Sequence, residues 1–478
     1  MRSLHWFRTD LRCEDNTALE NAIESSDELM AVFIIPLKTW KLHHAAPIKM
    51  DFILRNLAIL SENLKKRGIP LLVKVLESYL DSAEILKEIC ESYKVQAVYF
   101  NREYEVDELK RDKDVEKTIR ELGKDIYLFD DQTLLPPGLV LSQQNTPFKV
   151  FTHFKKAFFK KIGDSKILKP VKLSNKKFKL ITNPDPVPEL KGFIVNWEKN
   201  TMFWQAGEKH AEKLLLKFCQ DSLINYHIDR DFPYKNATSQ LSPYLAQGVI
   251  SPRKCIDFVM NYLEIDFLYE MEIFKGPSVW VSELIWRDFF KNILYHFPIV
   301  SRNKPFRIET ERVSWKYDIN LFKAWCDGAT GFPIIDAAMR QLNQTGWMHN
   351  RLRMVVANFL TKLLLIDWRW GERYFMENLI DGDLAANNGN WQWCASTGTD
   401  CAPYFRIFNP ILQSKKFDPE GKFIRKYCPE LSSLDNKSIH DPQENSHLFL
   451  KNNSYPDKII DLKKARQATL TAFQNLMG

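Results

Sequence analysis

Strand-length apolar runs alternate with amphipathic helical stretches over the first 130 residues, and this alternation most narrows the folds open to the chain. The apolar runs occupy residues 2–7, 29–36, 70–76 and 97–100. Helical patterns occupy residues 48–66, 82–93 and 106–122. Strands that alternate with helices predict an α/β domain, built on a doubly wound parallel sheet of the Rossmann-like kind.

Strand patterns almost vanish after about residue 202, and helical patterns replace them. These cover residues 211–219, 252–262, 279–296, 321–325, 334–344 and 347–367. In the last of them, apolar residues from Leu352 to Leu364 trace one stripe at helical spacing. The second half is therefore predicted to be an all-α domain.

Residues 155–199 differ in composition from both halves. Ten lysines crowd into positions 155–179, and four prolines fall between 170 and 188. An exposed connector is the favoured interpretation, with a basic nucleic-acid-binding arm as the alternative. A chain of 478 residues is long enough for two or three domains. We predict an α/β domain over 1–130, a linker over 131–200 and a helical domain over 201–478.

Composition narrows the class of protein. Hydrophobic residues make up 45% and charged residues 27%, as in soluble globular proteins, and the net charge of +7 permits nucleic-acid binding without requiring it. No run approaches membrane-spanning length, and Arg8, Asp10 and Arg12 come too early for a secretory signal, so a cytoplasmic location is expected. The eight cysteines form no CxxC pair, which indicates neither a zinc site nor a disulfide framework.

One run of twenty residues, 381–400, has a composition that neither a packed core nor a solvated loop needs. It holds Trp391 and Trp393 among amides, carboxylates and three glycines. Buried amides and acids need partners, so the mixture predicts a pocket for a large, flat, polar molecule. On a helix, Asp383, Asn387 and Trp391 would share a face, whereas Trp391 and Trp393 would point about 200° apart. Gly389 weakens the assumption that this helix is continuous.

Aromatic, basic and hydroxyl residues surround this run in the sequence. Nine of the thirteen tryptophans lie between 280 and 393. Core packing is the favoured interpretation of any one of them, and the functional alternative is stacking on a ligand or relaying electrons. Arg351 and Arg353 open a predicted helix, where they would either bind an anion or pair with Asp381 or Asp383. The hydroxyls of residues 238–242 would cap a helix, the favoured interpretation, or cradle a phosphate. No Gly-x-Gly occurs in the chain to hold a dinucleotide in the usual way.

Three motifs resemble the photolyase/cryptochrome family. They are Trp6-Phe7-Arg8-x-Asp10-Leu11-Arg12-x-x-Asp15-Asn16, the segment 347–354 and the run 381–400. The resemblance covers nearly the whole chain and is closest to bacterial class I cyclobutane pyrimidine dimer photolyases. It implies a monomeric carbon–carbon lyase that uses blue light and reduced FAD to repair pyrimidine dimers flipped out of ultraviolet-damaged DNA. It also implies that FAD lies in the helical domain without a glycine-rich turn, and it implies no metal.

The resemblance assigns roles to individual residues by position. The implied FAD contacts are Tyr226, Thr238, Ser239, Gln240, Leu241, Ser242, Trp280, Arg353, Asp381, Asp383 and Asn387, the last beside the flavin N5. The implied electron relay is Trp391, Trp368 and Trp315. The residues implied to meet the dimer or the DNA are Glu283, Trp286, Asn350, Arg351, Met354, Trp393 and Arg406, with Glu283 as the acid that hydrogen-bonds the dimer.

The family usually carries a second, light-harvesting chromophore, either methenyltetrahydrofolate or a deazaflavin. The segment 101–108 resembles the part of the family that contacts it, with Glu108 as the implied folate partner. The functional alternative is a cryptochrome, a blue-light photoreceptor without repair activity. Plant cryptochromes commonly place an acid where this chain has Asn387, and six-four photolyases are expected to have a second histidine where it has Asn350. A nucleic-acid-binding module without a cofactor would leave the run 381–400 unexplained.

Overall fold

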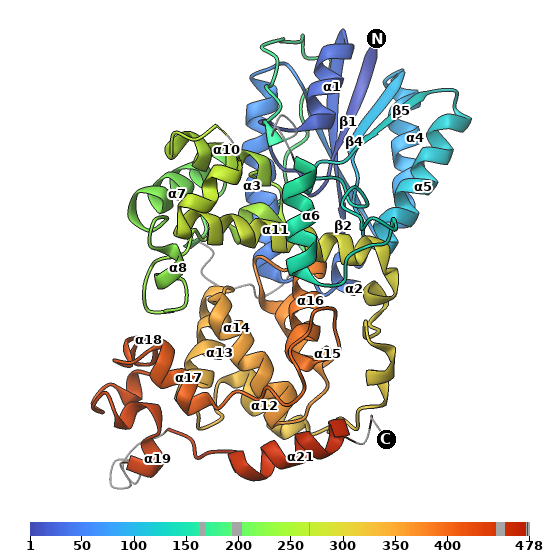
Figure 1. Cartoon of the computed structure of the whole chain (residues 1–478). Helices are drawn as coiled ribbons and strands as arrows, with labels where there is room; N and C mark the ends of the chain where they lie inside the picture. The colour runs from blue at the N-terminus through green and yellow to red at the C-terminus, as the bar shows by residue number, and fades with distance from the viewer. Residues whose placement is uncertain (163–167, 194–202, 267, 446–454, 475, 477–478) are drawn as a thin grey trace.

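A parallel sheet organises the N-terminal part of the chain (Figure 1). The computed structural model describes residues 1–162, 168–193, 203–266, 268–445, 455–474 and 476. Its strands are β1 (Arg2–Phe7), β2 (Glu28–Pro36), β3 (Leu71–Leu76), β4 (Ala97–Asn101) and β5 (Asp125–Phe129). The strand order is β3-β2-β1-β4-β5 with every neighbouring pair parallel, so the predicted doubly wound sheet is confirmed.

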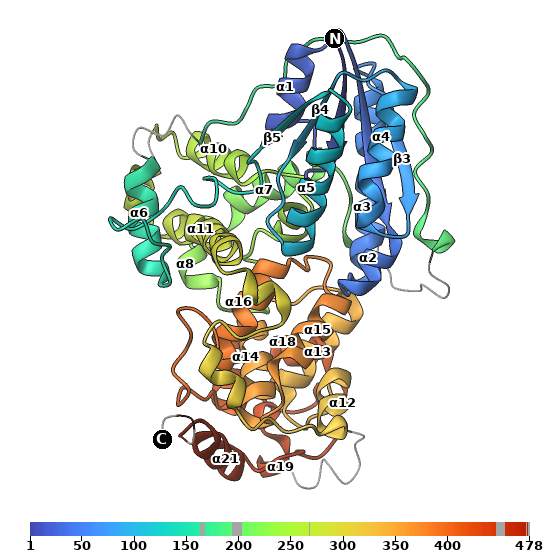
Figure 2. The same ribbon diagram turned by 90° about the vertical axis from the view of Figure 1, so that its right-hand side faces the viewer.

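Helices cover both faces of this sheet (Figures 1 and 2). They are α1 (Thr17–Ser25), α2 (Leu37–Leu42), α3 (Pro47–Lys65), α4 (Ser82–Ser92) and α5 (Val106–Glu121). Helices α4 and α5 pack on the face that carries Trp6 and Val32, and α1 and α3 pack on the face that carries Phe7 and Phe33. Because successive strand residues point to opposite faces and both faces are covered, an interior strand such as β2 is apolar from Leu29 to Ile35.

Three elements of this domain are absent from the sequence prediction. Strand β5 lies at the edge of the sheet and exposes Tyr127, and its apolar run is only the four residues 126–129. Helices α1 and α2 are short, with nine and six residues. A short helix shows too few turns for its periodicity to stand out.

The predicted linker contains a helix, α6 (Phe151–Ile162), that the lysine-rich composition conceals. Phe151, Phe154, Phe158 and Ile162 are buried along one side of it, against α11. The spacing of three or four residues between these apolar side chains is helical. The prediction that residues from 155 onward form only an exposed connector is therefore wrong for this helix, while the lysines of its other side remain on the surface.

The remainder of the described chain is helical, as predicted. Its α-helices are α7 (Glu208–Asp221), α8 (Tyr226–Asp229), α9 (Ser242–Ala246), α10 (Pro252–Tyr262), α11 (Lys275–His296), α12 (Ile319–Asp327), α13 (Pro333–Thr345), α14 (Asn350–Asn358), α15 (Trp368–Asn378), α16 (Leu384–Ala395), α17 (Pro410–Phe417), α18 (Lys422–Tyr427), α19 (Pro442–Asn445) and α21 (Leu462–Gln474). Helices α7 to α11 share a core with one face of the sheet, and a separate core forms among α12 to α18 and α21. None of the helices in the described ranges is long and apolar enough to cross a membrane.

The single helix predicted over 347–367 is confirmed between Asn350 and Leu363 and is wrong at both ends. Helix α14 ends at Asn358 and passes into one π-helical turn, Phe359–Leu363. Leu365 then adopts a positive φ of 56°, which a continuing right-handed helix cannot accommodate. Helix α15 starts afresh at Trp368, where Asp367 accepts a hydrogen bond from the Arg369 N–H. Because the apolar stripe continues through the break, periodicity alone does not reveal it.

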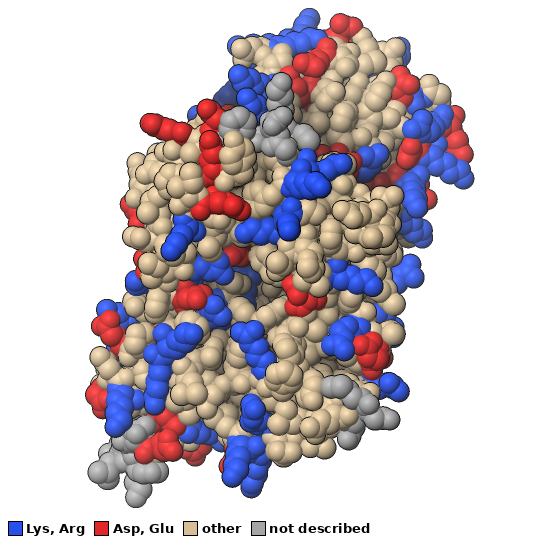
Figure 3. Space-filling view, viewed as in Figure 1, with Lys and Arg blue, Asp and Glu red and all other residues tan. Residues whose placement is uncertain are grey.

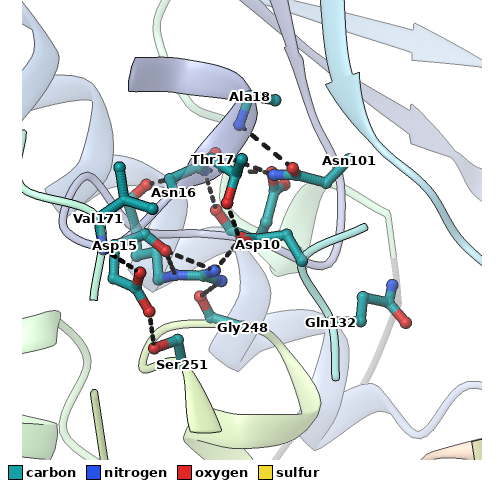
Figure 4. Close-up of polar contacts among 12 residues, drawn as sticks. Asp10, Asp15, Asn16, Thr17, Ala18, Asn101, Gln132, Val171, Gly248 and Ser251 are labelled. Atoms are coloured by element: carbon teal, nitrogen blue, oxygen red, sulfur yellow. Dashed lines mark hydrogen bonds and ion pairs between the residues drawn. The ribbon is translucent and has the colours of Figure 1, made fainter. Parts of the chain in front are cut away.

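Much of the first motif joins the two halves of the molecule (Figure 4). Asp15 accepts hydrogen bonds from Ser251, at the start of α10, and from Arg253, whose Nη2 lies 2.9 Å from its Oδ1. Arg12 and Arg253 both pair with Asp131, and these ionic side chains are at most 9% exposed. Buried charges of this kind need close partners, so the motif fixes how the sheet meets α10.

Candidate active site

Helix α16 carries the centre of the run 381–400 and packs against α11, α14 and α15 (Figure 2). The helix is continuous through Gly389. The glycine is needed for close packing on α11, because a Cβ at this position would lie 2.2 Å from Cδ1 of Phe290. Trp391 is 2% exposed, whereas Trp393 is only half-buried. The prediction that the two indoles face different surroundings is confirmed.

Asp383 is the N-cap of α16 and an ion-pair partner. Its side chain accepts a hydrogen bond from the Ala386 N–H at 2.9 Å and pairs with Lys291 Nζ at 2.8 Å. Burial alone would raise the pKa of Asp383, but the cations of Lys291 and Arg287 hold it well below its usual range. Lys291 also pairs with Glu105 of the first domain at 2.9 Å. Asp383 is therefore ionised and satisfied by protein groups, and its direct contact with FAD stays a prediction.

Asn387 is oriented by α15. Its Nδ2 donates to the backbone carbonyl of Glu372 at 2.9 Å, and the neighbouring Asn388 donates to the Glu372 carboxylate at 2.9 Å. Burial raises the pKa of Glu372 to about 7. None of the described residues donates a hydrogen bond to the Asn387 side-chain oxygen, so this oxygen is left for a ligand.

The two arginines of α14 have carboxylate partners. Arg353 Nη2 pairs with Asp381 Oδ2 at 2.8 Å, one of the pairings that the sequence leaves open. Arg351 pairs instead with Asp231, at 2.7 Å. Burial lowers the pKa of His349 to about 4, so this imidazole is neutral. Asp381 Oδ1 and His349 Nε2 are buried without a hydrogen-bond partner among the described residues. Two such atoms fit a site that a polar cofactor completes.

The hydroxyl-rich segment 238–242 does not cap a helix. Helix α9 has Leu241 at its N-cap and no capping side chain, so the favoured interpretation from sequence is wrong. Ser242 Oγ accepts a hydrogen bond from Trp347 Nε1 at 3.2 Å, which ties α9 to the segment before α14. Gln240 adopts a positive φ of 52°. Thr238 and Ser239 are half-buried beside it, so their hydroxyls stay available for the predicted phosphate contact.

Two further predicted cofactor contacts share an aromatic neighbour. Tyr226 of α8 and Trp280 of α11 are both buried, and their rings lie 5.6 and 5.4 Å from that of Phe218. Arg230 covers the Tyr226 ring at 5.6 Å and forms an ion pair with Glu283 of α11. Burial raises the pKa of Glu283, and Arg230 opposes that rise. The predicted catalytic acid and the predicted cofactor contacts thus meet on α8 and α11.

Six of the seven predicted substrate residues lie on α11, α14 and α16, and Arg406 lies in the loop between α16 and α17. Trp286 of α11 stacks on Phe151 of α6 with ring centroids 3.6 Å apart, a contact that the sequence gives no sign of. On α14, Arg351 Nη1 lies 3.7 Å from Met354 Sδ. The guanidinium of Arg406 lies 5.8 Å from the Trp393 ring of α16. Asn350 is exposed at the first position of α14. Lys and Arg side chains are numerous across the face of the molecule drawn in Figure 3.

The three tryptophans of the predicted relay are nearly buried: Trp391, Trp368 and Trp315 are 2%, 1% and 8% exposed. Trp391 packs on α15, the helix that begins with Trp368, and a Cβ on Gly371 would lie 2.1 Å from Trp391 Cη2. Trp315 lies 6.0 Å from the Phe473 ring of α21. The relay itself stays a prediction.

The predicted antenna residue Glu108 is buried at the start of α5, 3.7 Å from His43 Nδ1. Burial and the nearby carboxylates of Glu105 and Glu103 raise the pKa of Glu108 to about 8, and its Oε2 has no partner among the described residues. A small hollow of about 50 Å³ lies close by. Its lining residues include Trp6, Arg8, Trp40, Tyr79, Glu103 and Arg111.

The molecule joins a parallel-sheet domain to a helical domain. The site in the helical domain combines aromatic side chains with buried polar atoms that lack hydrogen-bond partners among the described residues. These features define a two-domain protein with a site suited to a flat polar cofactor. Comparison with known proteins also points to a two-domain protein that binds a cofactor. Residues 3–172 match the DNA photolyase family and residues 280–475 match the FAD binding domain of DNA photolyase. The chain belongs to the photolyase/cryptochrome family.

Relatives and solved structures match over almost the full length. The deoxyribodipyrimidine photo-lyase of Vibrio cholerae is 43% identical over 99% of this chain and 100% of its own. A crystal structure of a class III photolyase from Agrobacterium tumefaciens has a TM-score of 0.87 at 35% identity, covering 100% of this chain and 98% of that one. A cryptochrome from Synechocystis has a TM-score of 0.85 at 30% identity, covering 99% of each chain. The fold is therefore shared by repair enzymes and a cryptochrome.

Proposed function

We propose that this chain is a light-dependent DNA repair enzyme that splits cyclobutane pyrimidine dimers, a deoxyribodipyrimidine photo-lyase. The observation that carries the proposal is the full-length 43% identity with the Vibrio cholerae enzyme of that name. The site is consistent with it, because Asn387 rather than an acid occupies the position implied to face the flavin N5, and Asn350 rather than histidine follows His349.

FAD is the cofactor that the match to a photolyase FAD-binding domain supports. Bound and fully reduced, FAD would supply the light-driven electron that opens the dimer and would receive it back. The unpartnered atoms of Asp381 and His349 fit a polar cofactor, and Tyr226 and Trp280 offer aromatic surface. Asn387, fixed by the Glu372 carbonyl, would accept a hydrogen bond from the flavin N5–H through its side-chain oxygen.

The substrate would enter beside α11 and α16. Trp286 and Trp393 would hold the flipped dimer between apolar walls, since a damaged pair is easier to unstack than an intact one; the base-flipping class to which this rule applies includes photolyases. Glu283 would hydrogen-bond a thymine edge, and its ion pair with Arg230 keeps the carboxylate in place. Arg351 and Arg406 would meet backbone phosphates, so affinity should fall with added salt.

Trp391, Trp368 and Trp315 would restore the reduced cofactor by passing electrons inward. A second chromophore, methenyltetrahydrofolate or a deazaflavin, would lie near Glu108, whose free carboxyl oxygen supports a ligand there. We place the enzyme in the cytoplasm as a monomer.

The test is repair of ultraviolet-irradiated oligothymidylate by purified, photoreduced protein under blue light. We expect yellow protein that restores the thymine absorbance in light and not in the dark. Yellow protein without repair would favour the cryptochrome alternative, and colourless protein would contradict both. Glu283→Gln is the matched variant: it keeps the shape of the side chain and should slow repair while FAD content stays unchanged.

A further inference from the structure

A second line of aromatic rings leaves Trp391 toward a different part of the surface. The Trp391 ring lies 6.1 Å from that of Trp325 on α12, with the planes at 73°. Trp325 lies 5.8 Å from Phe322, and Phe322 lies 5.1 Å from Trp370 on α15. Trp370 lies 6.1 Å from Tyr317. The rings thus form a continuous series from α16 to the segment that precedes α12.

The members of this series that oxidise easily are indoles and a phenol. Phe322 is the exception, and it acts only as a spacer: because Trp325 and Trp370 lie 5.8 and 5.1 Å from it, their centroids are no more than about 11 Å apart. Trp325 is completely buried, and its Nε1 donates to the Val356 carbonyl at 3.1 Å. That hydrogen bond stabilises positive charge on the indole.

The outer end of the series is open to solvent. Tyr317 is 74% exposed, whereas Trp315, two residues earlier and the end of the predicted relay, is 8% exposed. The backbone pairing of Lys316 with Ile366 holds Tyr317 beside the start of α15, where Trp370 lies. A molecule in solution can therefore reach the Tyr317 ring more readily than the Trp315 ring.

We propose that Trp325, Trp370 and Tyr317 form a second electron route into Trp391, with Tyr317 as the site where a soluble thiol reductant delivers its electron. The proposal rests on the proposed function, because it needs Trp391 to lose an electron when the bound flavin is excited. It goes beyond that function by assigning a different entry point and a class of reductant.

The second route moves one electron inward from Tyr317 and releases one proton to water. Trp391 loses one electron, and Trp325, Trp370 and Tyr317 each pass one electron inward in turn. Tyr317 releases its phenolic proton to water as its electron leaves, which its exposure allows. A thiol then returns one hydrogen atom to the Tyr317 oxygen, and two of the resulting thiyl radicals combine into a disulfide.

The experiment traps the oxidised tyrosine. FAD-loaded protein is illuminated with blue light in the presence of a nitroso spin trap and without thiol, and tryptic peptides are analysed by mass spectrometry. We expect a light-dependent adduct on the Tyr317 peptide and none on the peptide of Tyr262, an exposed tyrosine outside the series. Trp370→Phe should reduce the Tyr317 adduct to the dark level while photoreduction through Trp368 and Trp315 continues.

Three further variants separate the two proposals. Trp368→Phe should retain some thiol-dependent photoreduction, and the pair Trp368→Phe with Trp370→Phe should lose it. An unchanged Tyr317 adduct in Trp370→Phe, or no adduct in the unmodified protein, would overturn the second route. Trp391→Phe should abolish photoreduction and adduct alike. If photoreduction survives in Trp391→Phe protein that still binds FAD, the proposed relay itself fails, whatever happens at Tyr317.

Discussion

Phe151 stacks face to face on Trp286, with ring centroids 3.6 Å apart and planes 9° from parallel. Phe151 is the first residue of α6, and its N–H donates to the Asp400 carboxylate at 3.0 Å. The Thr399 hydroxyl donates to the Lys149 carbonyl at 2.6 Å. The end of the run 381–400 thus positions the helix that covers one face of Trp286. Phe289 and Phe290 also pack against the indole, with ring centroids 5.6 and 5.5 Å away, so Trp286 is held rigid.

The first prediction follows from this stack. Phe151→Ala should weaken binding of dimer-containing DNA by about 1 kcal/mol, because an aromatic pair contributes about that much beyond its buried area. Fluorescence anisotropy with a labelled oligonucleotide measures the change. Phe159→Ala removes a ring from the same helix and should leave affinity unchanged. Trp286→Ala should weaken binding more than Phe151→Ala, and equal affinities for all variants would remove Trp286 from the substrate wall.

A second prediction separates electron supply from repair. Trp315→Phe should greatly slow photoreduction of the oxidised protein, since phenylalanine is much harder to oxidise than tryptophan. Repair by protein reduced chemically with dithionite should not change, because the relay is then unnecessary. Flavin absorbance follows the first process and thymine absorbance the second. Equal loss of both activities would argue that Trp315 has a structural role.

The third prediction concerns the Asn387 amide. Asn387→Asp removes the donor to the Glu372 carbonyl and would place a carboxylate at the proposed contact with the flavin N5. A carboxylate there would repel the negative charge that the flavin gains on reduction, and a repulsion of about 1.5–3 kcal/mol lowers the two-electron potential by roughly 30–65 mV. Spectroelectrochemical titration measures it. Asn390→Asp changes an exposed amide of the same helix, and an equal shift in that variant would contradict a specific role for Asn387.

The fourth prediction concerns a buried lysine. Lys362 is completely buried, and its Nζ donates to the Ala395 carbonyl at 3.0 Å and to Ser396 Oγ at 2.8 Å. Burial lowers the pKa of Lys362 to about 7, whereas the pKa of a lysine in an unfolded chain is about 10.4. Between these values the unfolded chain binds more protons, so this residue makes stability rise with pH, by at most about 1.4 kcal/mol per unit.

Urea unfolding at several pH values between those limits measures this contribution. Lys362→Met should remove it, so the variant should show a smaller rise in unfolding free energy with pH than the unmodified protein. Lys323→Met, at an exposed position of α12, is the control and should keep the original slope. Identical slopes in all three proteins would mean that Lys362 keeps its proton throughout the range.

Local patterns predicted some features correctly for identifiable reasons. Short, mostly apolar runs revealed β1 to β4, since strands covered on both faces carry apolar residues at most positions, although Ser3, His5 and Lys74 interrupt them. Helical spacing correctly predicted that Trp391 and Trp393 face different surroundings. Residues two positions apart on a helix point in nearly opposite directions, wherever that helix lies in the fold. The same spacing failed at Leu365, where a positive φ ends the helix although the apolar stripe continues.

Sequence alone determined the alternating α/β half, the helical half and a polar, aromatic run with family-specific motifs, because each depends on residues close together in the chain. Only the tertiary structure decided which charges and rings meet. Lys291 pairs with Asp383, and Phe151 covers Trp286, across separations of 92 and 135 residues. Such pairings depend on how whole helices pack, and no local periodicity records that packing.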